Sequence, residues 1–226
     1  MSAALPIVYA DEAMIVLDKP SGLLSVPGRG PENHDSLSVR VQAQFPDALI
    51  VHRLDMGTSG LLVMARGIEA QRTLSQHFAE RRTRKRYVAI AQGELPQRAD
   101  WSTIDAPLIV DWPNRPRSKV DHAIGKPSVT HWRRLGEQES CVGLARDHFR
   151  PAQAHSVLDL EPVTGRSHQL RVHLLSIGYP IAGDTLYGDA ANQAMATRLL
   201  LHAYALQIPH PVSGQDMHFC CPPRFA

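Results

Sequence analysis

The densest polar cluster in the sequence is the segment His52–Asp55, which the segment Thr58–Gly60 follows at close spacing. An aspartate can act as a nucleophile or as a base without any cofactor. Arg53 is close to Asp55 in the chain, and an arginine partner favours the ionised form of a carboxyl group. The cluster therefore indicates a catalytic carboxylate. The alternative is an ordinary turn that an Asp–Arg pair and a side-chain cap stabilise.

A second polar cluster spans Thr164–Arg171. Gly165 permits an unusual backbone turn, and Ser167 is expected to cap the helix that follows it. Arg171 comes three residues after His168, so both side chains are expected on one face of that helix. This face could present Arg171 to a carboxylate elsewhere in the chain. The alternative is a surface cap with solvated arginines.

Basic residues occupy five of the six positions of Arg81–Arg86. Such a run is suited to phosphates, and each phosphate that it neutralises steepens the salt dependence of binding. Arg82, Arg84 and Lys85 are the candidate contacts, and a solvated face is the alternative. Further arginines and two tryptophans could add backbone contacts and stacking surfaces: Arg115, Arg117, Arg133, Arg134, Trp112 and Trp132.

Metal and phosphate-loop motifs are missing from the sequence. Twelve histidines occur, yet no HExxH pattern does, and the spacing of His168 and His173 does not suit joint ligation on a helix. We therefore expect no metal. Gly28 and Gly30 form a lone GxG without a longer glycine-rich motif, and there is no GxSxG serine nucleophile.

The composition is that of an ordinary globular chain of 226 residues, with 43% apolar and 20% charged residues. Its net charge is +2, so overall charge argues neither for nor against a nucleic-acid partner. The three cysteines, Cys141, Cys220 and Cys221, form no CxxC motif, which fits a reducing compartment. With no signal peptide or apolar run of membrane-spanning length, we expect a cytoplasmic protein, a monomer without a membrane partner.

Short apolar runs lie on either side of these polar clusters. They predict many strands with few helices between them. Strands are expected at the following ranges: 14–17, 49–51, 60–65, 87–91, 104–110, 128–135, 156–160, 199–208 and 217–219. Helices are expected at 36–45, 68–81 and 168–177, where apolar residues recur at helical spacing. The irregular order favours an α+β fold with a mixed sheet. The polar segment Glu137–His155 is a candidate surface insertion.

Together, these segments resemble the RluA-type family of RNA pseudouridine synthases. The matching motifs follow the family's order and cover nearly the whole chain: Val16–Leu23, His52–Asp55 with Thr58–Val63, Arg86–Ala89 with Gly93, and Gly165–His173 with Gly183 and Asp184. The match is closest to members that act on both ribosomal and transfer RNA. Those members lack an N-terminal S4 domain, and so few residues precede Ile15 that we expect none here.

The resemblance implies a single catalytic domain over residues 1–226, with a mainly antiparallel sheet core flanked by helices and loops. It implies that uridine is isomerised to pseudouridine at tRNA position 32 and 23S rRNA position 746. The segment 137–155, which looks longer than its family counterpart, puts the second target in question. No cofactor is expected, because an isomerisation needs neither a redox partner nor an energy source.

Residue roles carried over from the family centre on Asp55, as either a nucleophile at C1′ or a base toward a ribose proton. Tyr87 matches the active-site tyrosine, which stacks on the uracil and helps to remove the C5 proton. Arg171 matches the arginine that pairs with the aspartate. Arg53 matches the residue that fills the space of the extruded base. The motifs also mark substrate-binding residues: His52, Arg166 and His168.

Three alternatives compete with this interpretation. The chain could be a synthase of the same family with another RNA target. It could be an inactive RNA-binding module, although binding alone does not require Asp55, Tyr87 and Arg171 together. It could also be an aspartate-dependent hydrolase, which would release free base. A retaining glycosidase would need a second carboxylate about 5–5.5 Å from the first, and the spacing of Glu161 does not recommend it.

Overall fold

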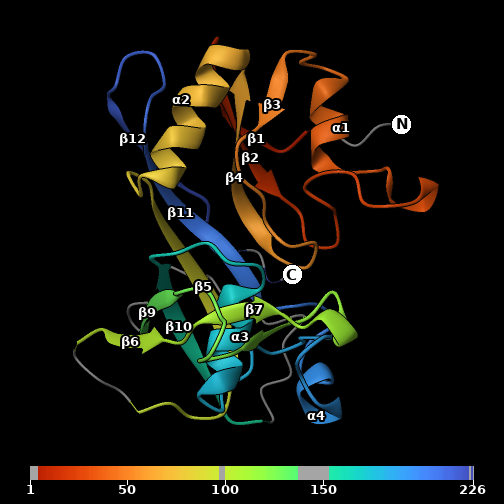
Figure 1. Cartoon of the computed structure of the whole chain (residues 1–226), viewed down its shortest axis with the longest axis vertical. Helices are drawn as coiled ribbons and strands as arrows, with labels where there is room; N and C mark the ends of the chain where they lie inside the picture. The colour runs from red at the N-terminus through yellow and green to blue at the C-terminus, as the bar shows by residue number, and fades with distance from the viewer. Residues whose placement is uncertain (1–4, 97–99, 137–152, 224, 226) are drawn as a thin grey trace. The chain divides into compact units, whose positions relative to one another are not determined.

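The computed structural model describes residues 5–96, 100–136, 153–223 and 225 (Figure 1). Within it, the chain forms two compact units: Met1–Lys85 with Ala203–Cys221, and Arg86–His202 with Pro222–Ala226. Of the expected insertion at 137–155, residues 137–152 lie outside the described part. No helix in the described ranges is both long and apolar enough to cross a membrane.

The first unit is built on a sheet in which the strand order is β1-β2-β4-β11, with β3 on β4 and β12 on β11. The pairings β1–β2, β2–β4, β3–β4 and β11–β12 are antiparallel. The strand bounds are as follows: β1 Ile7–Ala10, β2 Met14–Lys19, β3 Ala48–Ile50, β4 Ser59–Arg66, β11 Leu201–Pro209 and β12 Asp216–Cys220.

Helix α2 (Ile68–Ala79) packs along β4 in this unit (Figure 1). Ala70 and Leu74 lie four residues apart and are buried, and Phe78 packs against the same core. These residues join apolar side chains of the sheet: Met14, Val16, Leu61, Val63, Ala65, Leu206, Ile208 and Phe219. The predicted helical spacing is thus confirmed, because one apolar face is buried against the sheet. The shorter helix α1 (Leu37–Gln42) begins where Ser36 Oγ accepts a hydrogen bond from the Val39 N–H.

The second unit contains the strand order β5-β10-β9-β6, and all three pairings are antiparallel. A separate hairpin pairs β7 with β8. The bounds are as follows: β5 Arg84–Gln92, β6 Ser102–Asp105, β7 Leu108–Val110, β8 Ser118–Val120, β9 Val129–Arg134, β10 His155–Pro162, α3 Gln169–Ser176 and α4 Ala190–Gln193. The short 3₁₀ helices are η1 Pro31–Asn33 in the first unit and η2 Trp112–Asn114 in the second. This mixture, mainly antiparallel with few helices, confirms the predicted α+β class.

Helix α3 lies against β8 and β10, and all residues from Gln169 to Leu174 are buried. A helix that is buried on every side must satisfy its polar side chains internally, because water does not reach them. Gln169, Arg171 and His173 are such side chains, and each has protein partners, described below. The polar motif on α3 is therefore part of the packing of this unit.

Two predicted local features are wrong. The expected strand 104–110 is two strands, β6 and β7, because Pro107 between them lacks an N–H for a sheet ladder. Ser167 does not cap α3; the N-cap is His168, whose backbone is left-handed (φ 56°, ψ 19°) and whose side chain makes no capping hydrogen bond. The short elements β1, β8 and α4 were not predicted.

Candidate active site

Asp55 lies in the tight connection between β3 and β4, in the first unit, and is partly buried. The Thr58 N–H donates to the Asp55 carbonyl oxygen at 3.1 Å, which closes a turn around the aspartate. Arg53, two residues earlier, is exposed. The predicted polar connection between two strands is therefore confirmed, with the carboxylate on it.

The serines of the segment 19–25 hold this connection from both sides of Asp55. Ser25, which is buried, donates to the Leu54 carbonyl oxygen at 2.7 Å and accepts from the Leu54 N–H at 3.1 Å. Ser21 donates its hydroxyl to the Gly57 carbonyl oxygen at 2.7 Å. The backbone before and after the aspartate is thus bonded to one neighbouring segment, which restricts where the carboxylate can point.

Lys19 completes this support. Its side chain is fully buried, and Nζ donates to the carbonyl oxygens of Pro20, Leu23 and Met56 at 2.8, 2.6 and 3.1 Å. An ammonium group has three N–H donors, so these three bonds use its full donor capacity. Met56 directly follows Asp55, so the lysine ties the aspartate loop to the segment 19–25. Lys19 lies within the motif Val16–Leu23, but its role was not predicted from the sequence.

Gly60 explains why the aspartate motif ends in glycine. Its φ is +110°, and a Cβ at this position would lie 2.3 Å from the carbonyl oxygen of Ala203. Only glycine tolerates both this backbone conformation and so close an approach. The glycine therefore lets β4 start against β11 directly after the aspartate loop.

His52 is neutral and structural in this arrangement. Burial, together with the charge of Lys85, lowers the pKa of His52 from 6.5 to about 3. The Val63 N–H donates to Nε2 of His52 at 3.0 Å, so Nε2 is the unprotonated nitrogen. The ring also stacks on Phe78, with 4.5 Å between ring centroids. His52 thus anchors the aspartate loop to β4, and its part in substrate binding stays a prediction.

The residues of the basic run differ in how exposed they are. Arg82 and Arg84 are exposed, whereas burial lowers the pKa of the partly buried Lys85. Arg86 forms an ion pair with buried Asp159, and Nε of Arg133 donates to the same carboxylate at 3.3 Å. The exposed members are the ones suited to phosphates.

Arg86 and Arg133 also flank a tryptophan. The guanidinium carbons lie 4.5 and 5.3 Å from the ring centroid of Trp101. Trp132, which was expected as a stacking surface, is buried and cannot serve as one. The exposed tryptophans of the described part are Trp101 and Trp112.

Tyr87 belongs to β5 in the second unit, pairs with Leu160 of β10, and is buried. A buried aromatic ring at this place could equally be a core residue or the ring that stacks on a substrate uracil. Its catalytic role therefore stays a prediction.

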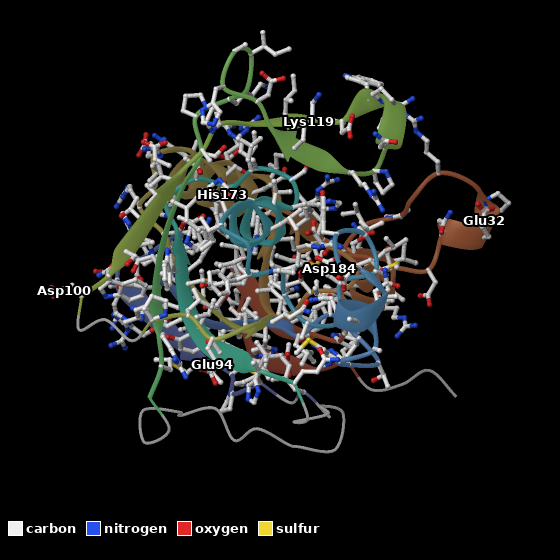
Figure 2. All side chains as sticks on the ribbon, turned by 90° about the horizontal axis from the view of Figure 1, so that it is seen from below. Glu32, Glu94, Asp100, Lys119, His173 and Asp184 are labelled. Carbon is white, nitrogen blue, oxygen red and sulfur yellow. The ribbon has the colours of Figure 1, made fainter. Side chains whose placement is uncertain are left out.

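Arg171 on α3 has a carboxylate partner in its own unit. It binds Asp184 in a bidentate ion pair, with Nε–Oδ2 at 2.8 Å and Nη2–Oδ1 at 2.6 Å. Both side chains are almost entirely buried (Figure 2 labels Asp184). The carboxylate compensates a guanidinium that would be costly to bury alone. The pairing of Arg171 with Asp55 stays a prediction.

Asp184 and Tyr187 were missed as site residues. The Oδ1 atom of Asp184 accepts from the N–H groups of Leu186 and Tyr187 at 3.0 and 3.1 Å, which fixes a turn. The Arg171 guanidinium carbon lies 5.0 Å from the Tyr187 ring centroid. Asp184 was visible as the aspartate of the motif Gly183–Asp184, and a buried arginine requires such a partner. No local spacing pointed to Tyr187.

His168 shares the Tyr187 hydroxyl with the hairpin β7–β8. The hydroxyl lies 2.7 Å from Nδ1 of His168 and accepts from the Ser118 N–H, also at 2.7 Å. The left-handed backbone of His168 places its side chain at the start of α3. Arg166, by contrast, is exposed.

The remaining polar residues of α3 bond to the sheet. Nε2 of His173 lies 2.9 Å from the Ala106 carbonyl oxygen and therefore carries the proton, and burial lowers the pKa of His173. Nδ1 then accepts from the Thr130 hydroxyl at 2.8 Å. Gln169 donates to the Thr130 hydroxyl oxygen and the Val129 carbonyl oxygen at 3.0 and 2.9 Å. These bonds fix the rotation of α3, and with it the direction of Arg171.

Comparisons with known proteins identify the family to which this chain is similar. The family model described as RNA pseudouridylate synthase matches residues 13–176. The dual-specificity RNA pseudouridine synthase RluA of Yersinia pestis is 48% identical over 97% of this chain and 99% of its own. The enzyme of that name from Escherichia coli K12 is 48% identical over 98% of this chain and 94% of its own.

Solved structures show the same fold. Human RNA pseudouridylate synthase domain containing 1 aligns with a TM-score of 0.77 and 28% identity, over 97% of this chain and 84% of that chain. Human RNA pseudouridylate synthase domain containing 4 aligns with a TM-score of 0.70 and 21% identity, over 97% and 89% of the two chains. The motifs, the fold and the relatives all lead to one assignment: this chain belongs to the RNA pseudouridylate synthase family.

Proposed function

We propose that this chain is a dual-specificity RNA pseudouridine synthase, active on transfer and ribosomal RNA, and that residues 1–226 act as one catalytic domain. The observation that carries this proposal is the 48% identity to RluA of Yersinia pestis over 97% of the chain. The proposed targets are the uridine at tRNA position 32, in the anticodon stem-loop, and the uridine at 23S rRNA position 746, in a hairpin.

The reaction breaks the bond between N1 of uracil and C1′ of ribose, turns the base, and joins C5 to C1′. The C5 proton leaves and N1 gains a proton, so the product has the composition of the substrate. A base within a folded stem cannot turn in place and must be extruded, which costs a few kcal/mol of stacking. Loop uridines reduce this cost because their bases are already less paired.

Three residues carry the proposed chemistry. Asp55 either attacks C1′ or removes a ribose proton, and the hydrogen bonds from Ser25, Ser21 and Lys19 to its loop support a fixed direction of attack. Arg171 keeps this carboxylate charged, and Tyr87 stacks on the uracil and assists removal of the C5 proton. Preorganised groups of this kind lower the barrier because they need no rearrangement during the reaction.

The central test replaces Asp55 with asparagine and maps pseudouridine in unmodified tRNA and in a 23S rRNA fragment. We expect product at the two proposed uridines with the parent chain and a rate loss of more than about a thousand-fold with Asp55→Asn. RNA affinity should change little. Asp35→Asn removes an exposed carboxylate from the same unit and should behave as the parent. Turnover of Asp55→Asn near the parent rate would refute the assignment.

A second measurement separates the synthase from a hydrolase. A synthase leaves the RNA at unchanged mass and releases no base, whereas a hydrolase releases uracil and leaves an abasic site. Free uracil in amounts equal to the uridine consumed would contradict the proposed reaction. Product at other uridines would keep the reaction and change the targets.

A further inference from the structure

The hairpin β7–β8 carries an exposed aromatic tip, which we call the arm and define as residues 108–120. Trp112 at the tip is 65% exposed, the largest exposure of a tryptophan in the described part. Tryptophan combines a large apolar ring with an N–H donor and is enriched at interaction surfaces, so this exposed ring is a candidate contact.

The charge of the arm favours a nucleic acid. Arg115, Arg117 and Lys119 are all exposed (Figure 2 labels Lys119 on this hairpin). The acidic residue of the tip, Asp111, is engaged locally, because its Oδ2 accepts from the Asn114 side-chain amide at 2.8 Å. Three cations on the arm that carries this exposed ring are complementary to phosphates and not to an apolar protein surface.

The ring is presented in a form that suits a base. The Arg115 guanidinium carbon lies 4.2 Å from the Trp112 ring centroid, so one face of the indole is covered by a cation. Aromatic rings of this kind stack on unpaired bases, and neighbouring arginines add cation–π attraction. Bases in RNA loops offer free faces for such stacking, whereas bases inside a duplex do not.

The tip is held in place before any partner binds. The Asp111 and Arg117 backbones are bonded at 2.9 Å, the Asn114 N–H donates to the Asp111 carbonyl oxygen at 2.9 Å, and the Arg117 N–H donates to the Asn114 carbonyl oxygen at 3.0 Å. A loop that is already ordered loses less entropy on binding. These bonds make the tip a fixed platform.

The start of β8, next to the tip of the arm, is joined to the surroundings of Arg171. Ser118 of β8 donates its N–H to the Tyr187 hydroxyl, and the Tyr187 ring lies against the Arg171 guanidinium. Figure 2 shows the hairpin beside α3, where His173 is labelled. An RNA that reaches Arg171 would therefore pass close to the arm.

From these observations we infer that Trp112, flanked by Arg115, stacks on an unpaired base of the substrate RNA while Arg117 and Lys119 contact its phosphates. This inference rests on the proposed function, because it takes the substrate RNA as the partner. Trp112, Arg115 and Arg117 were expected from the sequence only as general stacking and backbone contacts, and the inference gives them a defined partner in the substrate RNA.

The test compares binding of two probes, a synthetic anticodon stem-loop and a fully paired RNA duplex of equal length. Trp112→Ala should weaken stem-loop binding about 5- to 100-fold and leave duplex binding unchanged. Trp112→Phe should retain most of the affinity, because phenylalanine keeps an aromatic face. Ile124→Ala is the matched control, since Ile124 is 70% exposed and contributes no ring.

Two outcomes would overturn the inference: Trp112→Ala binding the stem-loop as tightly as Ile124→Ala, or losing equal affinity for both probes. Pseudouridine formation by the parent chain is measured separately, so the two proposals can fail independently. A parent that forms pseudouridine while Trp112→Ala binds normally keeps the function and removes the arm contact. A parent without activity removes the function, and the two-probe comparison still decides whether the ring stacks on RNA.

Discussion

At the scale of single residues, the polar side chains of the motifs make specific bonds that hold the backbone. Nε2 of His52 accepts from Val63, Nζ of Lys19 donates to three carbonyl oxygens, and Nδ1 of His173 accepts from Thr130. For the two histidines, these bonds also determine which ring nitrogen carries the proton. The polar residues of these motifs, which suggest catalysis when seen in the sequence, thus also hold the backbone around Asp55 and Arg171.

The histidine of the aspartate motif makes stability depend on pH. The pKa of His52 is about 3 in the folded chain and 6.5 without the fold, so the unfolded state binds the proton more readily. Stability is therefore fully present above about pH 6.5 and is lost as pH falls toward 3. At pH 5 this residue should account for a loss of about 2 kcal/mol relative to pH 7.

His52→Gln tests this expectation, because glutamine keeps an acceptor for the Val63 N–H and does not titrate. Urea unfolding at pH 7 and pH 5 should show a smaller loss of unfolding free energy for His52→Gln than for the parent, by about 2 kcal/mol. The control His34→Gln removes an exposed histidine of the same unit and should follow the parent. An identical pH dependence in parent and His52→Gln would contradict a partly buried His52 that is neutral in the folded chain.

At the scale of elements, the sequence predicts those helices and strands whose apolar residues recur at a regular spacing. Helix α2 was expected at Ile68–Arg81 and lies at Ile68–Ala79, because Ala70, Leu74 and Phe78 share one face. The strands expected at 14–17, 60–65, 87–91 and 199–208 were found where expected. The four-residue strand β1 and the three-residue strand β8 were missed, since runs so short carry no clear period.

The parts of the site that depend on distant contacts could not be predicted from spacing. Asp184 lies 13 residues after Arg171, and Tyr187 lies 69 residues after Ser118, so no helical or strand period relates either pair. The expected cap at Ser167 was wrong for a related reason. The left-handed backbone of His168, whose side chain bonds to Tyr187, moves the helix start one residue later.

The Tyr187 hydroxyl joins two elements, because it bonds both to Ser118 of β8 and to His168 at the start of α3. Tyr187→Phe should leave the N–H of buried Ser118 without this acceptor, which costs about 1–3 kcal/mol of unfolding free energy. Hydrogen exchange at the Ser118 amide should accelerate accordingly. Tyr179→Phe removes a hydroxyl elsewhere in the same unit and serves as control. Unchanged exchange at Ser118 in Tyr187→Phe would show that the hydroxyl does not hold the hairpin.

At the scale of the whole molecule, the net charge of +2 supplies almost no general attraction to RNA. Binding must then depend on where the cations lie. The ion pair with Asp159 engages Arg86, and burial disfavours the charged form of Lys85, whereas Arg82 and Arg84 are exposed. The exposed pair therefore carries the expected phosphate contacts of the basic run.

A charge-matched comparison separates local contacts from total charge. Arg82→Gln/Arg84→Gln should weaken stem-loop binding and reduce the slope of log affinity against log salt by about 2, one unit for each lost phosphate contact. Arg40→Gln/Arg72→Gln removes the same total charge at positions that form surface ion pairs with Asp35 and Glu69. This control should leave the slope close to that of the parent. Equal slopes for the two double variants would mean that total charge governs binding and that the basic run is only a solvated face.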